Sequence, residues 1–234
     1  MILPEYLRLF SYLDLLALGL LVGSSLAIGW RIEREDTPNR SVAVLMSAYR
    51  REWMRHFVTR QPRIFDANII DSLRQGTSFF ASACMIAIGG GLALVGNSER
   101  LMGLARDLTL ETAHAVVLEI KVMVVILFIA GAFLNFVWAH RLFGYCAIVM
   151  AAVPNEPDDP VTYARAAQAA EINISAARNF NRGLRGVYFA LGALPWLVGA
   201  VPLIVSTALT VWVLWRREFA SRSREVMLSR LPGA

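Results

Sequence analysis

Long uncharged stretches dominate the pattern of hydrophobic and polar positions along the chain. Three stretches contain no Asp, Glu, Lys or Arg, and a fourth, Leu9–Trp30, contains only Asp14. Roughly 20 apolar helical residues cross a hydrocarbon core of about 30 Å. The pattern therefore predicts an all-α integral membrane bundle with about four transmembrane helices. The uncharged stretches are Gln75–Ser98, Val122–Ala139 and Gly186–Trp215.

We expect one membrane domain over residues 1–234, with amphipathic or extramembrane helices between the spans. Between the first two spans, apolar residues from Val42 to Phe57 recur every three or four positions, which indicates one face of a helix. This face either lies in the head-group plane of the membrane or covers the end of the bundle. The expected spans are 7–30, 74–97, 114–140 and 186–215, and the expected extramembrane helices are 40–60 and 160–181.

The last uncharged stretch, Gly186–Trp215, is longer than one span requires. As a single helix its 30 residues would be about 45 Å long. Pro195 and Pro202 lie in its middle, and each removes a backbone hydrogen-bond donor. The stretch is therefore either one kinked helix or two half-helices that meet between the prolines. Interrupted backbone at membrane depth persists only where protein or a cavity surrounds it.

The charged residues bear on topology and partners. The net charge is +5, from 22 Arg and one Lys against 18 acidic residues, and most arginines lie next to the spans. Cytoplasmic loops are enriched in such residues, and anionic lipid head groups attract them. We expect anionic membrane lipids as partners, and no nucleic acid. Four crossings would place both termini outside, whereas the arginines after Trp215 favour the cytoplasm, and a returning last segment would remove this conflict.

Charged side chains inside a span are candidates for function, because an unpaired charge in a bilayer is unfavourable. Asp14 lies in the first span, and Glu119 and Lys121 lie near the start of the third. We expect Asp14 and Lys121 at similar depth. They form an ion pair there, or Lys121 binds a lipid phosphate or extends to the interface.

A second candidate is a basic, hydrogen-bonding pocket at the cytoplasmic ends of the spans. Its side chains would bind an anionic head group. The alternative is ordinary interfacial anchoring and helix capping. The candidate residues are Arg74, Asn135, Trp138, His140, Arg141, Asn181, Arg182 and Arg185.

Patterns for catalysis or metal binding are weak. No Ser-His-Asp set can be assembled at one depth, and Cys84 and Cys146 form no Cys-x-x-Cys pair. Glu111 and His114 form one Glu-x-x-His unit, whereas a carboxylate di-iron bundle needs two. We therefore expect no metal and no cofactor, and we favour a protein without enzymatic activity.

Four blocks of the chain carry a family resemblance: Arg50–Met54 (RREWM), Pro62–Ala83 (PRIFDANIIDSLRQGTSFFASA), Phe133–Phe143 (FLNFVWAHRLF) and Asn181–Gly199 (NRGLRGVYFALGALPWLVG). With these blocks, the chain resembles the uncharacterised family called domain of unknown function 599. The family pattern has Trp-Ser-Leu-Arg where this chain has WAHR at 138–141. The resemblance implies a multi-pass protein of the bacterial inner membrane, with about four spans and helical extramembrane segments, and it implies no activity.

Two functions are compatible with these observations. The first is a non-catalytic accessory, scaffolding or lipid-contacting subunit, which the small residues at Gly19, Gly23 and Gly89–Gly91 favour, since they allow close helix contacts. The second is a small transporter or channel that uses the proline-broken fourth segment and the charges within the spans. In either case the expected partners are membrane lipids and other membrane protein chains or further copies of this chain.

Overall fold

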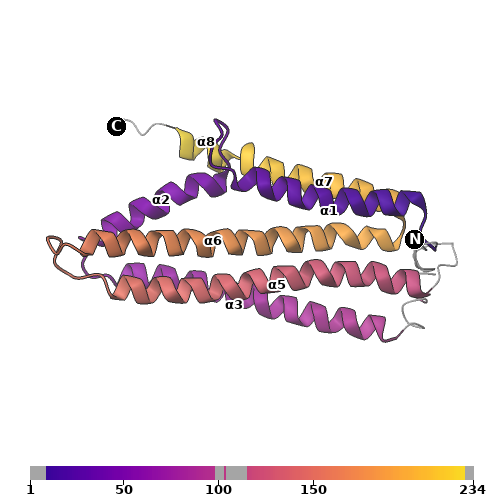
Figure 1. Cartoon of the computed structure of the whole chain (residues 1–234), viewed down its shortest axis with the longest axis horizontal. Helices are drawn as coiled ribbons and strands as arrows, with labels where there is room; N and C mark the ends of the chain where they lie inside the picture. The colour runs from indigo at the N-terminus through magenta and orange to yellow at the C-terminus, as the bar shows by residue number, and fades with distance from the viewer. Residues whose placement is uncertain (1–8, 98–102, 104–114, 230–234) are drawn as a thin grey trace, which may run out of the picture. The chain divides into compact units, whose positions relative to one another are not determined.

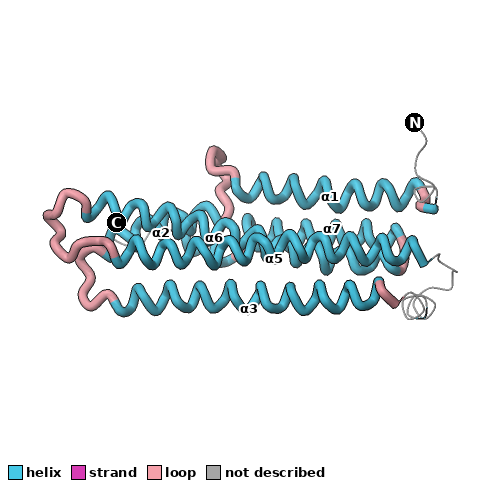
Figure 2. Tube along the Cα trace, turned by 60° about the horizontal axis from the view of Figure 1, so that its bottom comes forward, coloured by secondary structure: helices cyan, strands magenta, loops and turns pink. Residues whose placement is uncertain are grey.

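The computed structural model describes residues 9–97, 103 and 115–229, and these residues form helices and loops without strands (Figures 1 and 2). The predicted all-α fold is confirmed. Four segments are long and apolar enough to cross a membrane: Tyr12–Glu33, Ile64–Val95, Ala115–Ala151 and Ala200–Leu228. The helices are α1 (Tyr12–Glu33), α2 (Val42–Phe57), α3 (Ile64–Val95), α5 (Ala115–Ala151), α6 (Thr162–Ala193), α7 (Ala200–Phe219) and α8 (Arg222–Leu228).

The chain forms two compact units, and it passes from one to the other five times. The first, which we call the apolar unit, comprises Met1–Arg31, Ala83–Ala132 and Leu184–Trp215. The second, the basic unit, comprises Ile32–Ser82, Phe133–Gly183 and Arg216–Ala234. Helices α3, α5 and α6 each contribute residues to both units.

Three helices are longer than their predicted counterparts. The predicted span 74–97 is the second part of α3, because no Pro or Gly interrupts the helix between Ile64 and Gly76. The predicted span 114–140 continues to Ala151 in α5, whose 37 residues extend about 55 Å. A hydrocarbon core of about 30 Å covers little more than half of that length.

The predicted span 186–215 is not one helix. Helix α6 joins the predicted helix 160–181 to the start of this span and ends at Ala193, where a 3₁₀ turn, Leu194–Leu197, follows. The prolines explain the interruption, since neither can donate a backbone hydrogen bond. Helix α7 then begins, and its Ser206 hydroxyl donates to the Gly192 carbonyl at 2.5 Å. The chain therefore turns back along α6, which is the broken arrangement left open by the sequence.

This turn changes the expected topology. The chain passes between the units five times, so it ends in the basic unit. The residues after Trp215 therefore belong to the same unit as the basic segments Ile32–Ser82 and Phe133–Gly183. The basic unit thus contains 17 of the 23 Lys and Arg residues and 12 of the 18 acidic residues. Membership of a unit gives no side of the membrane, so the expectation that both termini share a side stays a prediction. A returning last segment remains the alternative in which the C-terminal arginines and the other basic segments share a side.

Helix α2 packs on the core of the basic unit with its apolar face. Met54 and Phe57 are buried in one cluster with the end of α5 and the beginning of α6. Trp53 packs against the same cluster, and its indole N–H donates to Asp66 at 2.6 Å. Of the two interpretations of this face, the structure therefore shows the one in which it covers the helical bundle. Tyr49, on the same face, is exposed.

Two glycines bring α6 close to α5. A Cβ atom on Gly183 would lie 2.6 Å from Cε1 of Phe136, and one on Gly186 would lie 3.0 Å from the Cβ of Ala132. Phe136 also stacks on Phe80, with ring centroids 5.3 Å apart. Small residues at these positions allow the two helices to approach closely.

The membrane-length helices leave most of their apolar surface uncovered by the chain itself. In the most apolar 18-residue window of α3, only 6% of the residues are buried. In the corresponding window of α1, 17% of the residues are buried. Exposed side chains there include Phe79, Ile86 and Leu26. Apolar surface of this extent is unfavourable in water. It requires lipid or another protein chain as its surroundings.

Candidate functional site

Two of the predicted site residues, Arg74 and His140, meet in the basic unit. The Nδ1 atom of His140 lies 3.4 Å from the carbonyl oxygen of Arg74 and 3.2 Å from the hydroxyls of Thr77 and Ser78. Arg74 directly precedes the uncharged stretch of α3, and His140 directly follows that of α5. The two predicted span boundaries therefore lie at the same level.

A cavity of about 620 Å³ lies beside Arg74. The beginning of α3 and the end of α5 line it, together with the loop that follows α5. Its polar lining comes from Arg63, Asp71, Arg74 and Asn155, and the rest is mainly apolar. Cavities of this volume are typical of sites for small molecules.

Arg63 is held at the edge of this cavity by backbone carbonyls. Its Nη1 donates to the carbonyl of Val153 and its Nη2 to that of Pro154, both at 2.8 Å. These carbonyls belong to the loop that follows α5. The guanidinium also lies over the Phe57 ring, 4.5 Å from its centroid. Arg63 thus joins the loop before α3 to the end of α5, a role that its sequence position does not reveal.

Two arginine nitrogens at the cavity lack acceptors. The Nε atoms of Arg63 and Arg74 are buried, and neither has a hydrogen-bond partner within the described residues. Buried N–H groups nearly always have a partner, and leaving one unsatisfied costs about 1–3 kcal/mol. Both residues line the cavity, but the two buried Nε atoms are not part of its accessible surface.

Asp66 is the most deeply buried carboxylate of the basic unit. Its side chain is 0% exposed, and it accepts hydrogen bonds from the Trp53 indole and from Arg60. The carboxylate therefore ties α2 and the following loop to the beginning of α3. Nothing in the sequence spacing of Asp66 indicated these two partners.

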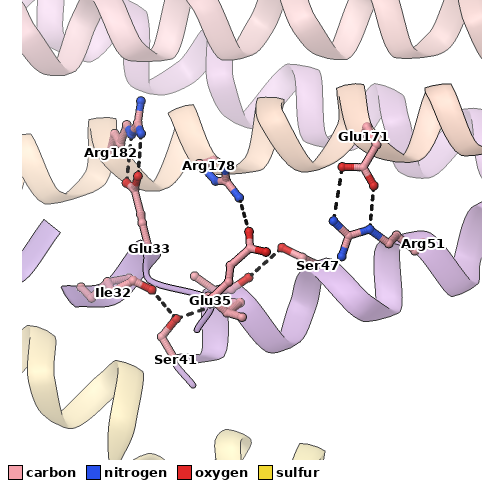
Figure 3. Close-up of polar contacts among 11 residues, drawn as sticks. Ile32, Glu33, Glu35, Ser41, Ser47, Arg51, Glu171, Arg178 and Arg182 are labelled. Carbon is pink, nitrogen blue, oxygen red and sulfur yellow. Dashed lines mark hydrogen bonds and ion pairs between the residues drawn. The ribbon is translucent and has the colours of Figure 1, made fainter. Parts of the chain in front are cut away.

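Ion pairs join α6 to the end of α1, to the segment that follows α1, and to α2 (Figure 3). Arg182 contacts both carboxylate oxygens of Glu33, at 2.9 and 2.5 Å, and this hydrogen bonding raises the pKa of Arg182. Arg178 donates to Glu35 at 2.8 Å. Arg182 is one of the residues predicted to bind an anionic head group. The structure shows it paired with a carboxylate of the chain itself, and its contact with a head group stays a prediction.

The same array continues along α2 (Figure 3). Arg51 donates to Glu171 at 2.6 Å, which raises the pKa of Arg51. Arg50 donates to the side-chain oxygen of the buried Asn173, and burial lowers the pKa of Arg50. These contacts fix the orientation of α2 on α6.

The other predicted pocket residues do not gather at the cavity lining. Arg141 donates to the hydroxyl of Tyr145 on the exposed side of α5, and Trp138 is 48% exposed. Arg185 belongs to the apolar unit, where its guanidinium lies against Gly29. Asn135 and Asn181 are half-buried.

In the apolar unit, the predicted intramembrane charges meet a buried tryptophan. The indole N–H of Trp196 donates to Asp14 at 2.7 Å, and the Lys121 ammonium lies 5.6 Å from the centroid of the same indole. Lys121 is only 8% exposed and Trp196 1%. Glu119 is half-buried on α5. The 3₁₀ turn between α6 and α7 places Trp196 in this group, which the sequence did not predict.

Metal-binding groups are not formed by the part of the chain that the structure describes, since no cluster of three His, Cys, Asp or Glu side chains occurs there. Glu111 and His114 lie outside the described residues.

Comparison with known proteins gives one match. The profile of the family described as "Protein of unknown function, DUF599" matches residues 14–223. No curated protein and no solved structure matches the chain. The match covers both units, and it assigns no activity to either.

Proposed function

The chain belongs to the DUF599 family of proteins of unknown function, and from this premise we propose that it is a non-catalytic subunit of the bacterial inner membrane. In this proposal the apolar unit spans the bilayer. The basic unit faces the cytoplasm, contacts acidic lipids and serves as an accessory or scaffolding surface for other membrane proteins.

The observation that carries the proposal is the separation of charge between the units. Of the 23 Lys and Arg residues, 17 belong to the basic unit, which has a net charge of +5, whereas the apolar unit has as many acidic as basic residues. Positive charge is enriched on the cytoplasmic side of membrane proteins, where it meets anionic lipids. The five passes collect this charge on one side of the membrane.

Two further features support an accessory role. The apolar window of α3 is 6% buried, so this helix has a large surface for lipid or a partner helix. Asp14 and Lys121 both contact Trp196 within the apolar unit. Charged groups that are satisfied inside the bundle stabilise it and leave less freedom to bind a transported solute.

A small transporter or channel is the rival function. The break between α6 and α7 favours it, because an interrupted helix beside Asp14 and Lys121 resembles the half-helices that form transport sites. In this case the group around Trp196 would bind the solute.

Purification in a mild, uncharged detergent tests the proposal. We expect the chain to resist alkaline extraction from membranes and to copurify with acidic phospholipids at several times their share of the total extract. Replacing Arg55, Arg141 and Arg222, which are exposed in the basic unit, with Gln should reduce this enrichment while membrane integration persists. A lone monomer with the average lipid composition of the membrane would contradict the proposal.

Flux measurements separate the rival. Proteoliposomes that contain the chain should show no more ion or solute flux than empty vesicles. Flux that disappears in an Asp14→Asn variant, but not in an Arg222→Gln control, would support the transporter instead.

A further inference from the structure

One face of α5 is exposed along the part of the helix that belongs to the basic unit. The residues of this face follow one another at intervals of three or four, so they share one side of the helix. Along the chain, the face changes from apolar through aromatic to charged. The exposed residues are Leu134, Trp138, Arg141 and Tyr145.

Arg141 carries the charge of this face. From Val122 to Ala151 the chain contains no other Asp, Glu, Lys or Arg. The Nε atom of Arg141 donates to the Tyr145 hydroxyl, and its guanidinium carbon lies 5.6 Å from the centroid of the same ring. Helical side chains point toward the N-terminus of their helix, which is why Tyr145 reaches back to Arg141. Tyr145 therefore orients the guanidinium without neutralising it.

The lack of a carboxylate distinguishes Arg141 from four other arginines of the basic unit. Within the described residues no carboxylate pairs with Arg141, whereas Arg51, Arg60, Arg178 and Arg182 each form an ion pair. A guanidinium remains charged in proteins, and its planar set of donors suits phosphate or carboxylate oxygens. Because Arg141 is exposed, an anion from outside the chain can reach it.

The position of Arg141 points to lipid as the source of that anion. Arg141 is the first charged residue after the uncharged stretch Val122–Ala139. If that stretch crosses the bilayer, Arg141 lies at the level of the head groups, and this placement rests on the function proposed above. Trp138 and Leu134 then lie on the membrane side of Arg141, and tryptophan is enriched at such interfaces. A lipid whose phosphate binds Arg141 therefore directs its acyl chains over Trp138 and Leu134 into the bilayer.

A second copy of the chain fits this face less well. Chains in one membrane share their orientation, so a two-fold contact along α5 brings each residue close to its own counterpart. The two Arg141 guanidinium groups would then meet, and α5 has no carboxylate from Val122 to Ala151 to separate them. An anionic head group supplies the charge that a second copy lacks.

We infer that Trp138, Arg141 and Tyr145 form a binding site for one anionic phospholipid on the exposed face of α5. The terminal nitrogens of Arg141 donate to the phosphate, and Tyr145 orients the guanidinium through its Nε atom. The Trp138 ring contacts the glycerol and the first methylene groups. The proposed contact with acidic lipids thereby gains one defined site.

Native mass spectrometry of the full chain in an uncharged detergent tests this inference. Dioleoyl phosphatidylglycerol is titrated as the probe, and dioleoyl phosphatidylcholine and inorganic phosphate are titrated in parallel. We expect the first phosphatidylglycerol to bind about fivefold more tightly than phosphatidylcholine, which is the effect of one arginine at an anionic surface. Inorganic phosphate that displaces phosphatidylglycerol at equal concentration would show a site for free anions and overturn the lipid assignment.

Three variants separate the roles of charge and ring. Arg141→Gln should weaken phosphatidylglycerol about fivefold and leave phosphatidylcholine unchanged, because only the charge is lost. Trp138→Ala keeps the charge and should weaken both lipids to the same degree. Arg40→Gln is the matched control, since it removes one exposed charge of the basic unit in the loop between α1 and α2. It should bind both lipids like the unmodified chain.

A photoreactive probe locates the site on the helix. Phosphatidylglycerol with a diazirine on the first carbons of one acyl chain should label α5 between Leu134 and Arg141. A label recovered on other helices, or a crosslink between two copies through this face, would overturn the inference.

The thermal midpoint without added lipid checks that each variant is folded. Equal phosphatidylglycerol affinities of folded Arg141→Gln and Arg40→Gln would overturn the inference, even where the chain integrates into membranes and enriches acidic lipids as proposed. A chain that alkaline extraction removes from membranes refutes the proposed function instead, because that measurement does not depend on Arg141.

Discussion

The two units of this protein place their charged residues in different surroundings. In the basic unit, guanidinium groups pair with carboxylates, as in Arg182 with Glu33 and Arg51 with Glu171. In the apolar unit, Asp14 meets a neutral indole, and Lys121 lies over the same ring. Water screens the exposed ion pairs of the basic unit, whereas a charge within a membrane span is unfavourable unless a partner satisfies it.

The units also differ in what stabilises them. The basic unit has an internal core, in which Met54, Phe57, Cys146 and Ala169 are almost fully buried. The apolar unit also has a buried cluster, formed by Leu118, Val122 and Ile126, but few residues in the apolar windows of α3 and α1 are buried. Helices α3, α5 and α6 each contribute residues to both units. Each of these helices therefore changes from an apolar to a more polar composition where it passes from one unit to the other. Five measurements would break or sharpen this comparison.

The largest effect concerns the side on which each unit lies. Reporters inserted after Thr37, Asn155 or Ser229, all in the basic unit, should report the cytoplasm, and one inserted after Val198 should report the outside. The reason is that the chain passes between the units five times. If the reporters at Ser229 and Val198 agree, helix α7 does not return and the division of charge is wrong.

The next effect concerns the buried carboxylate of the basic unit. Asp66→Ala should destabilise the protein by about 2–4 kcal/mol, because Trp53 and Arg60 lose a buried partner. Unfolding in detergent by circular dichroism measures it. The matched control is Asp71→Ala, whose exposed carboxylate contacts Gln75 and whose loss should cost less than about 1 kcal/mol. Equal losses would show that burial is not the cause.

Close packing distinguishes two glycines, one in each unit. Gly183→Ala should destabilise by about 1–3 kcal/mol, because the new Cβ meets the buried Phe136 ring at 2.6 Å. Gly89→Ala meets nothing within 4 Å and should change stability by less than about 1 kcal/mol, in the stabilising direction. Thermal midpoints of the two variants provide the test, and the opposite order would contradict the α5–α6 contact.

A smaller effect is expected for the charges of the apolar unit. A double-mutant cycle with Asp14→Asn and Lys121→Met should give a coupling of about 0.5–2 kcal/mol, because both side chains contact Trp196. Unfolding in detergent supplies the four free energies. Strictly additive losses would dismiss the proposed pairing of these charges.

The smallest effect is expected for an exposed ion pair. Glu171→Gln should cost less than about 1 kcal/mol, and high salt should abolish the difference, since both side chains are about half exposed. The pKa of Arg51 is raised in the folded state. The stabilisation that Arg51 gains from its raised pKa is therefore fully present below the ordinary pKa of arginine. It is lost only as the pH rises through the raised pKa. A change in this contribution near neutral pH would contradict the assignment.

Much of the helical fold was predictable, because uncharged stretches and helical periodicity are local properties. The nearly uncharged stretch Leu9–Trp30 correctly located α1, and the uncharged stretch Gln75–Ser98 correctly located most of α3. The ends were less predictable, since a helix can continue from an apolar into a polar segment when no Pro or Gly interrupts it. Helix α5 continues in this way to Ala151.

The candidate site was predictable only in part. The sequence grouped Arg74 with His140 because both border an uncharged stretch, and the structure brings His140 Nδ1 to 3.4 Å from the Arg74 carbonyl oxygen. That the group binds a head group stays a prediction. Arg63 was missed, since its partners are the carbonyls of Val153 and Pro154, 90 and 91 positions away. Arg182 was expected to face lipid, and only the fold shows that Glu33 occupies its guanidinium.

The sequence by itself determined that the chain is helical, that its apolar stretches have membrane length, and that its charge is positive. These properties depend on composition and on spacing along one segment. The tertiary structure alone decided that α7 returns beside α6, that the arginines after Trp215 join the other basic segments, and that Arg63 and Arg74 line one cavity. These properties depend on contacts between residues far apart in the chain, whose free energies no single segment contains.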